Sequence, residues 1–195
     1  MINWTSLFIY SAVLCFTPGP NNINCLYFAA KDGFKKTIRY MIGSMGTLFV
    51  KILLCGCLNV LLATIIPAVT VYLKWAGALY MLYIAWHMAK SGWEDDKEET
   101  TSFEPGIKTG IMLQLLNGKS WVAAMSLYSV YVIPHSTAFL HIFLAAFIFS
   151  ALAGVASVLW AGMGIAIKNL MSKHKKIFGI VMSLGLVYCA VSAVL

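Results

Sequence analysis

The chain has 195 residues, of which 61% are hydrophobic and 11% are charged, and its mean hydropathy is +0.83. This composition excludes a soluble globular domain and makes the lipid bilayer the expected partner of most of the surface. The formal net charge is +7. Because the basic residues gather in a few connections between apolar segments, we interpret the charge as loop charge at a membrane and expect no nucleic-acid partner.

Six apolar segments are each near or above the roughly 20 residues that a helix needs to cross a bilayer. They cover residues 2–30, 40–66, 68–89, 107–133, 138–167 and 177–195, with Pro67 between the second and the third. The sequence therefore predicts an all-α membrane protein with six transmembrane helices. The five cysteines lie in these segments without the spacing of a zinc or haem site, so no metal and no other cofactor is expected.

The first segment is interrupted by Thr17, Pro18, Gly19 and Pro20, which are followed by Asn21 and Asn22. Because proline has no backbone N–H, a continuous helix here would leave the carbonyls of Leu14 and Phe16 without partners. Unpaired backbone in hydrocarbon costs several kcal/mol, which predicts that the break lines protein or a polar cavity. The free N–H groups and the positive dipole end of the following half-helix favour a small anionic ligand there.

Basic residues indicate how the chain is oriented. Eleven of the fourteen Lys and Arg residues lie in three connections, around residues 31–39, 90–108 and 168–176. The positive-inside rule places these connections in the cytoplasm and both termini outside. The connection at residues 91–106 also carries six acidic residues, and we interpret it as a solvated hinge.

This hinge divides a single transporter domain into two halves, residues 1–90 and 107–195, with three segments each. An odd number of segments inserts the halves in opposite orientations, as two inverted three-helix repeats. The fourth helix should then be broken like the first. It contains a matching polar interruption, formed by Gln114, Asn117, Gly118, Lys119 and Ser120.

The two interruptions are expected at about the same depth. Gly118 lies eleven residues past Ile107, at the cytoplasmic end of the fourth segment, and Gly19 lies eleven residues before Ala30. Lys51, in the second segment, falls near that depth. A lysine at mid-bilayer costs about 2.5–3.5 kcal/mol, so Lys51 is predicted to face the protein interior, with snorkelling to an interface as the alternative.

No Asp or Glu lies inside a predicted segment, so the two lysines near mid-depth, Lys51 and Lys119, indicate that a substrate supplies the carboxylate. A neutral, zwitterionic amino acid fits best, because a dibasic substrate would require fixed acids. The predicted substrate-binding residues are Thr17, Pro18, Gly19, Pro20, Asn21, Asn22, Gln114, Asn117 and Lys119. Lys51 and Lys119 are the candidates for charge or coupling, and no catalytic residue is predicted.

The run Thr-Pro-Gly-Pro-Asn at residues 17–21 resembles the signature of the LysE/RhtB family of bacterial amino-acid exporters, and the likeness covers the whole chain. The stretches 113–117 and 186–191 are most similar to the cysteine/O-acetylserine branch. The resemblance implies export of small neutral amino acids or derivatives (cysteine/O-acetylserine-like, or homoserine/threonine/leucine-like) across the bacterial cytoplasmic membrane. It also implies proton antiport and no enzymatic activity. The family often has proline where this chain has Gly118.

Other classes of protein fit the sequence less well. A membrane thiol relay using Cys15 would need a second cysteine in the matching segment, and none lies between Cys57 and Cys189. A non-transporting membrane subunit has no need of matched polar interruptions, and a channel would show intramembrane acids or a filter-like run. The pair Gly106 and Gly110 is compatible with helix packing within one chain or within a homo-oligomer, and the sequence leaves this open.

Overall fold

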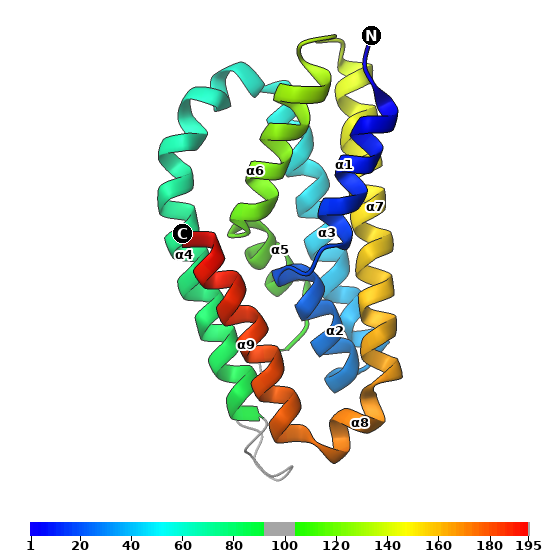
Figure 1. Cartoon of the computed structure of the whole chain (residues 1–195), viewed down its shortest axis with the longest axis vertical. Helices are drawn as coiled ribbons and strands as arrows, with labels where there is room; N and C mark the ends of the chain where they lie inside the picture. Colours follow the sequence, from blue (N-terminus) through cyan, green and yellow to red (C-terminus); the bar gives the residue numbers. More distant parts are fainter. Residues whose placement is uncertain (92–103, 195) are drawn as a thin grey trace.

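A computed structural model describes residues 1–91 and 104–194, and within them the chain is helical with no strand (Figure 1). The helices are α1 (Trp4–Phe16), α2 (Pro20–Asp32), α3 (Phe34–Cys57), α4 (Asn59–Ser91), α5 (Ile107–Leu115), α6 (Gly118–Ser126), the π-helix η1 (Leu127–Val132), α7 (Phe139–Ala166), α8 (Lys168–Lys173) and α9 (Lys175–Val194). Of the predicted acidic connection, residues 92–103 lie outside the described part of the chain.

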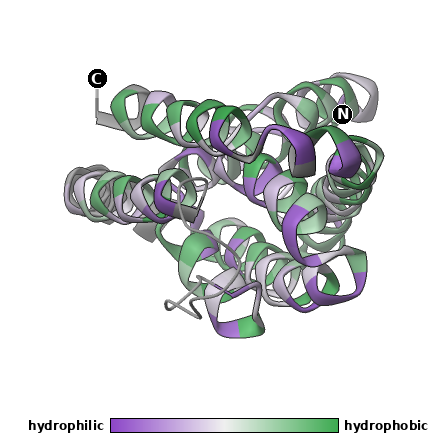
Figure 2. Cartoon of the chain, turned by 90° about the horizontal axis from the view of Figure 1, so that it is seen from below, coloured by the Kyte–Doolittle hydropathy of each residue, from purple (hydrophilic) through white to green (hydrophobic). Residues whose placement is uncertain are grey.

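Helices α3 and α7 are each long and apolar enough to cross a bilayer, and they are the two that meet both criteria among the described residues. Many large hydrophobic side chains along the bundle are exposed. In the end-on view of Figure 2, green hydrophobic residues cover much of the length of the helices. Exposed apolar side chains on this scale are characteristic of a surface whose solvent is lipid.

The chain leaves the helical conformation at both predicted interruptions. The first break separates α1, which ends at Phe16, from α2, which begins at Pro20; the second separates α5, which ends at Leu115, from α6, which begins at Gly118. Proline is well tolerated at the first position of a helix, where its missing N–H would have no partner. In Figure 1 both breaks lie near mid-height of the bundle, and the chain runs through them in opposite directions.

The predicted boundary between the second and third segments is wrong. Helix α3 ends at Cys57, and Leu58, with φ −109° and ψ 21°, separates it from α4. Pro67, expected to divide the two segments, lies inside α4, whose upper part curves in Figure 1. Hydropathy gives no signal for this boundary because the sequence on both sides is apolar, and a helix accommodates an internal proline by bending.

Helix α3 occupies the centre of the fold. It packs against α2, α5, α6 and α7, while α4 packs along α9 and α1 packs along α7. Helix α3 therefore contacts α2, which follows the first break, and both pieces of the second break, so that its side chains can join the two.

Helices α3 and α5 touch through their backbones. A Cβ atom on Gly43 would lie 2.2 Å from the carbonyl oxygen of Ile107, and one on Gly110 would lie 2.2 Å from the carbonyl oxygen of Tyr40. Both glycines are needed because no side chain fits between the two backbones. Of the small-residue pair noted in the sequence, Gly110 thus packs within the chain.

Adding a methyl group at this crossing is expected to destabilise the protein. Gly43→Ala should lower stability by about 1–3 kcal/mol, because overpacking forces the two backbones apart. Gly46→Ala, on the same helix but with no atom within 4 Å of the added Cβ, is the matched control. Thermal unfolding of both variants in detergent measures the difference, and equal midpoints would contradict the close approach.

Candidate functional site

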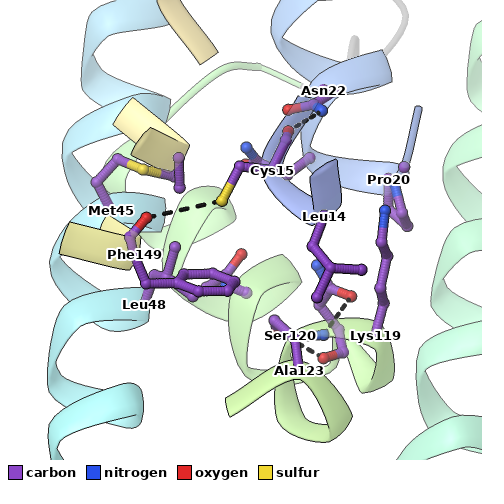
Figure 3. A pocket seen from close by; sticks show the side chains of 15 residues that line it. Leu14, Cys15, Pro20, Asn22, Met45, Leu48, Lys119, Ser120, Ala123 and Phe149 are labelled. Atoms are coloured by element: carbon purple, nitrogen blue, oxygen red, sulfur yellow. Dashed lines mark hydrogen bonds between the residues drawn. The ribbon is translucent and has the colours of Figure 1, made fainter. Parts of the chain in front are cut away.

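The two breaks meet through Lys119. Its Nζ lies 3.4 Å from the position that a Cβ atom on Gly19 would occupy. Gly19 has φ −164° and ψ 173°, an extended conformation open to any residue, so glycine matters here for the close approach of the ammonium group. Figure 3 shows the Lys119 side chain running toward Pro20 at the start of α2. A cation from the second break is thereby placed at the first.

A cavity of about 60 Å³ lies between the breaks (Figure 3). A cavity needs roughly 10–15 Å³ to hold a single water molecule, so this one is large enough for water or a small polar group. Its polar lining comes from both breaks and consists of Asn21, Asn22, Gln114, Asn117, Lys119 and Ser120. The rest of the wall, apart from Gly19 and the thiol of Cys15, is apolar.

A second cavity of about 440 Å³ adjoins the first, and the two share the residues Gly19, Pro20, Asn117 and Lys119. Helices α4 and α9 contribute to its wall, the latter through Cys189. The Lys119 side chain is exposed and borders both cavities. A charged group at the boundary of a small and a large cavity is well placed to hold an ionic ligand.

Asn22 is buried and its amide faces the first break. The side-chain Nδ2 donates to the carbonyl oxygen of Cys15 at 2.8 Å and to that of Thr17 at 3.0 Å. The Thr17 hydroxyl donates to the carbonyl of Val13. The two bonds from Asn22 satisfy carbonyl groups that have no helical partner at the end of α1, so the Asn22 amide holds the break together.

The Asn21 side chain joins α2 to two other helices. Its Nδ2 donates to Ser157 Oγ of α7 at 3.0 Å, and its Oδ1 accepts from Tyr40 at 3.0 Å and from Ser44 at 2.7 Å. Ser44 Oγ also lies 3.3 Å from Gln114 Oε1 at the second break. These three hydroxyl residues were not predicted as part of the site, although the four-residue spacing of Tyr40 and Ser44 puts them on one helix face.

Lys51 lies in the interior, with 2% of its surface exposed. Its Nζ donates to the backbone carbonyl of Gln114 at 2.7 Å and to the hydroxyl of Ser120, and it stands 5.0 Å from the ring centroid of Trp121. Ser120 in turn donates to the carbonyl of Asn117 at 2.8 Å. Lys51 therefore bridges the end of α5 and the start of α6, and it lines neither cavity described above.

The structure thus brings most of the predicted residues together. Gly19, Pro20, Asn21, Asn22, Gln114, Asn117 and Lys119 line the smaller cavity, and Pro18 lines the larger one. Thr17 lines neither of the two. Cys15 borders the smaller cavity and Cys189 the larger, and both are free thiols.

A lipid-exposed helical bundle whose broken helices meet at a polar cavity has the construction of a secondary transporter. The chain belongs to the family of LysE type translocators, whose profile matches residues 12–195. The resemblance seen at the Thr-Pro-Gly-Pro-Asn run is confirmed, and the protein is a translocator and not an enzyme.

Curated relatives agree with this family. A protein of Escherichia coli strain K12 and one of Shigella sonnei strain Ss046 are each 33% identical over 190 residues, covering 96% of this chain and 93% of the relative. One from Escherichia coli O1:K1 / APEC is 33% identical over 189 residues with the same coverage. All three bear the name cysteine/O-acetylserine efflux protein. No solved structure is significantly similar to this chain.

Proposed function

We propose that this protein is a secondary active exporter of small neutral amino acids or their derivatives in a bacterial cytoplasmic membrane. The observation that carries the proposal is the Lys119 ammonium group, which reaches from the second break to Gly19 at the first. Relatives named for cysteine/O-acetylserine efflux support the same substrate class.

The carboxylate of the substrate binds where α2 and α6 begin. The first N–H groups of a helix have no intrahelical partner, and the helix dipole adds positive potential at that end. Asn21 and Lys119, the second residues of these two helices, both border the smaller cavity. The Lys119 ammonium supplies the full charge, and charge-assisted hydrogen bonds of this kind are among the strongest in proteins.

A neutral amino acid balances the charges of the site. Among the described residues that line the smaller cavity there is one lysine and no Asp or Glu. The lysine pairs with the carboxylate, and the α-ammonium group of the substrate is held by neutral oxygen atoms, including Gln114 Oε1. A second positive charge on the substrate would have no counter-ion in this lining, which favours neutral over basic amino acids.

Two inverted repeats, residues 1–90 and 107–195, form the transporter in this proposal, with six membrane spans. Three pairs of contacts support it. In the two repeats α1 corresponds to α5, α2 to α6, α3 to α7 and α4 to α9. The contact of α1 with α7 then matches that of α5 with α3, and the contact of α2 with α9 matches that of α6 with α4. Lys51 of α3 is hydrogen-bonded to Ser120, the third residue of α6. In the same way, Ser157 of α7 is hydrogen-bonded to Asn21, the second residue of α2. Rocking of one repeat against the other then exposes the site to each side in turn.

The basic connections face the cytoplasm in this arrangement, and both termini lie outside, because Lys and Arg are retained on the cytoplasmic side of a membrane. Three exposed lysines of the described part, Lys35, Lys108 and Lys168, lie in or next to such connections. The acidic residues of the central connection contribute little to this orientation.

Efflux from cells preloaded with single amino acids tests the function. The panel is cysteine, O-acetylserine, homoserine, threonine, leucine and lysine, and the protein is expressed in a strain that retains each compound. We expect faster loss of one or more of the neutral compounds and no change for lysine. A protein that is inserted at normal abundance and moves none of the panel would overturn the proposal.

Proton antiport is the proposed driving reaction, and a lysine is the proposed carrier because the predicted spans contain no acid. We expect Lys51→Met to make the efflux rate insensitive to an imposed proton gradient. Methionine is unbranched and one atom shorter than lysine, but it cannot carry a proton or donate to Gln114 and Ser120. The efflux rate in vesicles, measured with and without the gradient, gives the result. Gradient-driven efflux that persists in both Lys51→Met and Lys119→Met would contradict the proposal.

A further inference from the structure

The smaller cavity has an apolar side opposite the residues of the breaks. Helices α1, α3, α6 and α7 build it from Cys15, Met45, Leu48, Ala123, Phe149 and Ala153. Five of these six are buried, Met45 being partly exposed. One small cavity therefore presents charged and polar groups on one side and a closed apolar wall on the other.

We propose that this apolar side is the pocket for the substrate side chain, and that Phe149 and Ala153 set the size of the amino acid that is exported. The inference rests on the proposed function. It specifies the substrate class as amino acids with short side chains, such as cysteine, serine and homoserine, and it disfavours leucine and larger residues.

The polar groups suggest the direction of the side chain. Lys119 and the start of α2 border both cavities, and in this proposal the α-carbon of the amino acid lies in the smaller one, which also holds Asn21 and Gln114. The side chain of the amino acid must then point away from the polar groups, which leaves the wall formed by α7 and α3. In Figure 3 the Phe149 side chain extends into this space from α7, with Leu48 and Met45 on the neighbouring helix.

The apolar wall is rigid enough to discriminate between substrate side chains of different size. Phe149 is 4% exposed and Leu48 is 3% exposed, and both belong to the largest buried cluster of the described chain. The Cys15 thiol donates to the Phe149 carbonyl oxygen at 3.7 Å, which links α1 to α7 at this point. Close-packed side chains cannot move aside without losing contacts, so a cavity of about 60 Å³ with this wall discriminates against bulky side chains.

Variants that enlarge the pocket and a variant that reduces it test the inference. Phe149→Leu and Phe149→Ala enlarge the pocket and should raise the efflux of leucine relative to cysteine at least tenfold, within the 10- to 200-fold range for one methylene in an apolar pocket. Ala153→Val reduces the pocket and should lower the efflux of homoserine relative to serine by a similar factor. Each result is a ratio of rates for two substrates, so it does not depend on how much protein folds.

Two matched controls lie on the same helix and point away from the cavity. Phe147→Ala alters a phenylalanine that is 57% exposed, and Ala151→Val alters an exposed alanine, and neither should change the ratios. Unchanged ratios in the Phe149 and Ala153 variants, with active wild type, would overturn the pocket assignment and leave the exporter function standing. A wild-type protein that exports none of these compounds would overturn both.

Discussion

Lys119→Met is expected to reduce amino-acid efflux roughly ten- to a hundredfold while leaving membrane insertion unchanged. Lys119 is the one cation among the described residues that line the smaller cavity. Without it, the substrate carboxylate would have no counter-charge in this lining. Losing a hydrogen bond to a charged group costs about 1.5–3 kcal/mol, and each 1.36 kcal/mol corresponds to a factor of ten. Initial efflux rates from preloaded cells, divided by the amount of inserted protein, measure the loss.

Two further variants sharpen this experiment. Lys119→Arg keeps the positive charge and should retain part of the activity. Lys108→Met removes an exposed lysine in the first turn of α5, outside both cavities, and should export at the wild-type rate. Wild-type efflux in Lys119→Met would show that the substrate charge is met elsewhere, and the assignment of the carboxylate site would have to be abandoned.

The double substitution Pro18→Ala/Pro20→Ala is expected to abolish efflux by closing the first break. Alanine restores two backbone N–H groups, which can donate to the carbonyls of Leu14 and Phe16 four residues earlier. Joining α1 and α2 into one continuous helix would move Gly19 away from the Lys119 ammonium and take the α2 N-terminus out of the cavity. Transport assays combined with the helix content from circular dichroism measure both effects.

Insertion should survive this change, because a continuous apolar helix satisfies its backbone groups in lipid better than a broken one. Pro134→Ala is the matched control. Pro134 is exposed and lies between η1 and α7, so its replacement should leave efflux intact. If the double variant exports at the wild-type rate, the break has no role in transport and the proposed mechanism fails.

Local chemistry explains why both breaks could be predicted from the sequence. A proline determines which carbonyl loses its partner, and an amide, a glycine and a lysine within an apolar run indicate the second break without any tertiary information. The interior position of Lys51 follows from the cost of its charge in hydrocarbon. The boundary at Leu58 had no such marker, because apolar residues continue across it and Pro67 offered a stronger but misleading signal.

The different roles of the two neighbouring asparagines could not be predicted, because they depend on tertiary structure. Asn21 and Asn22 are equivalent in the sequence, but successive residues of a helix point about 100° apart. One asparagine therefore reaches α3 and α7 and the other turns back onto the end of α1. Ser44 and Ser157 could not be recognised because their partners lie 23 and 136 residues away. Long-range pairs of this kind carry no local pattern.

The bridge made by Lys51 also constrains how the protein is synthesised. Its acceptor on Gln114 lies 63 residues further along the chain. At about 5–20 residues per second, that acceptor leaves the ribosome roughly 3–13 s after the lysine. During this interval α3 enters the membrane with a charged side chain that has none of its final partners. The N-terminal half on its own is therefore an incomplete folding unit, and the arrival of α5 and α6 gives the lysine its place in the mature protein.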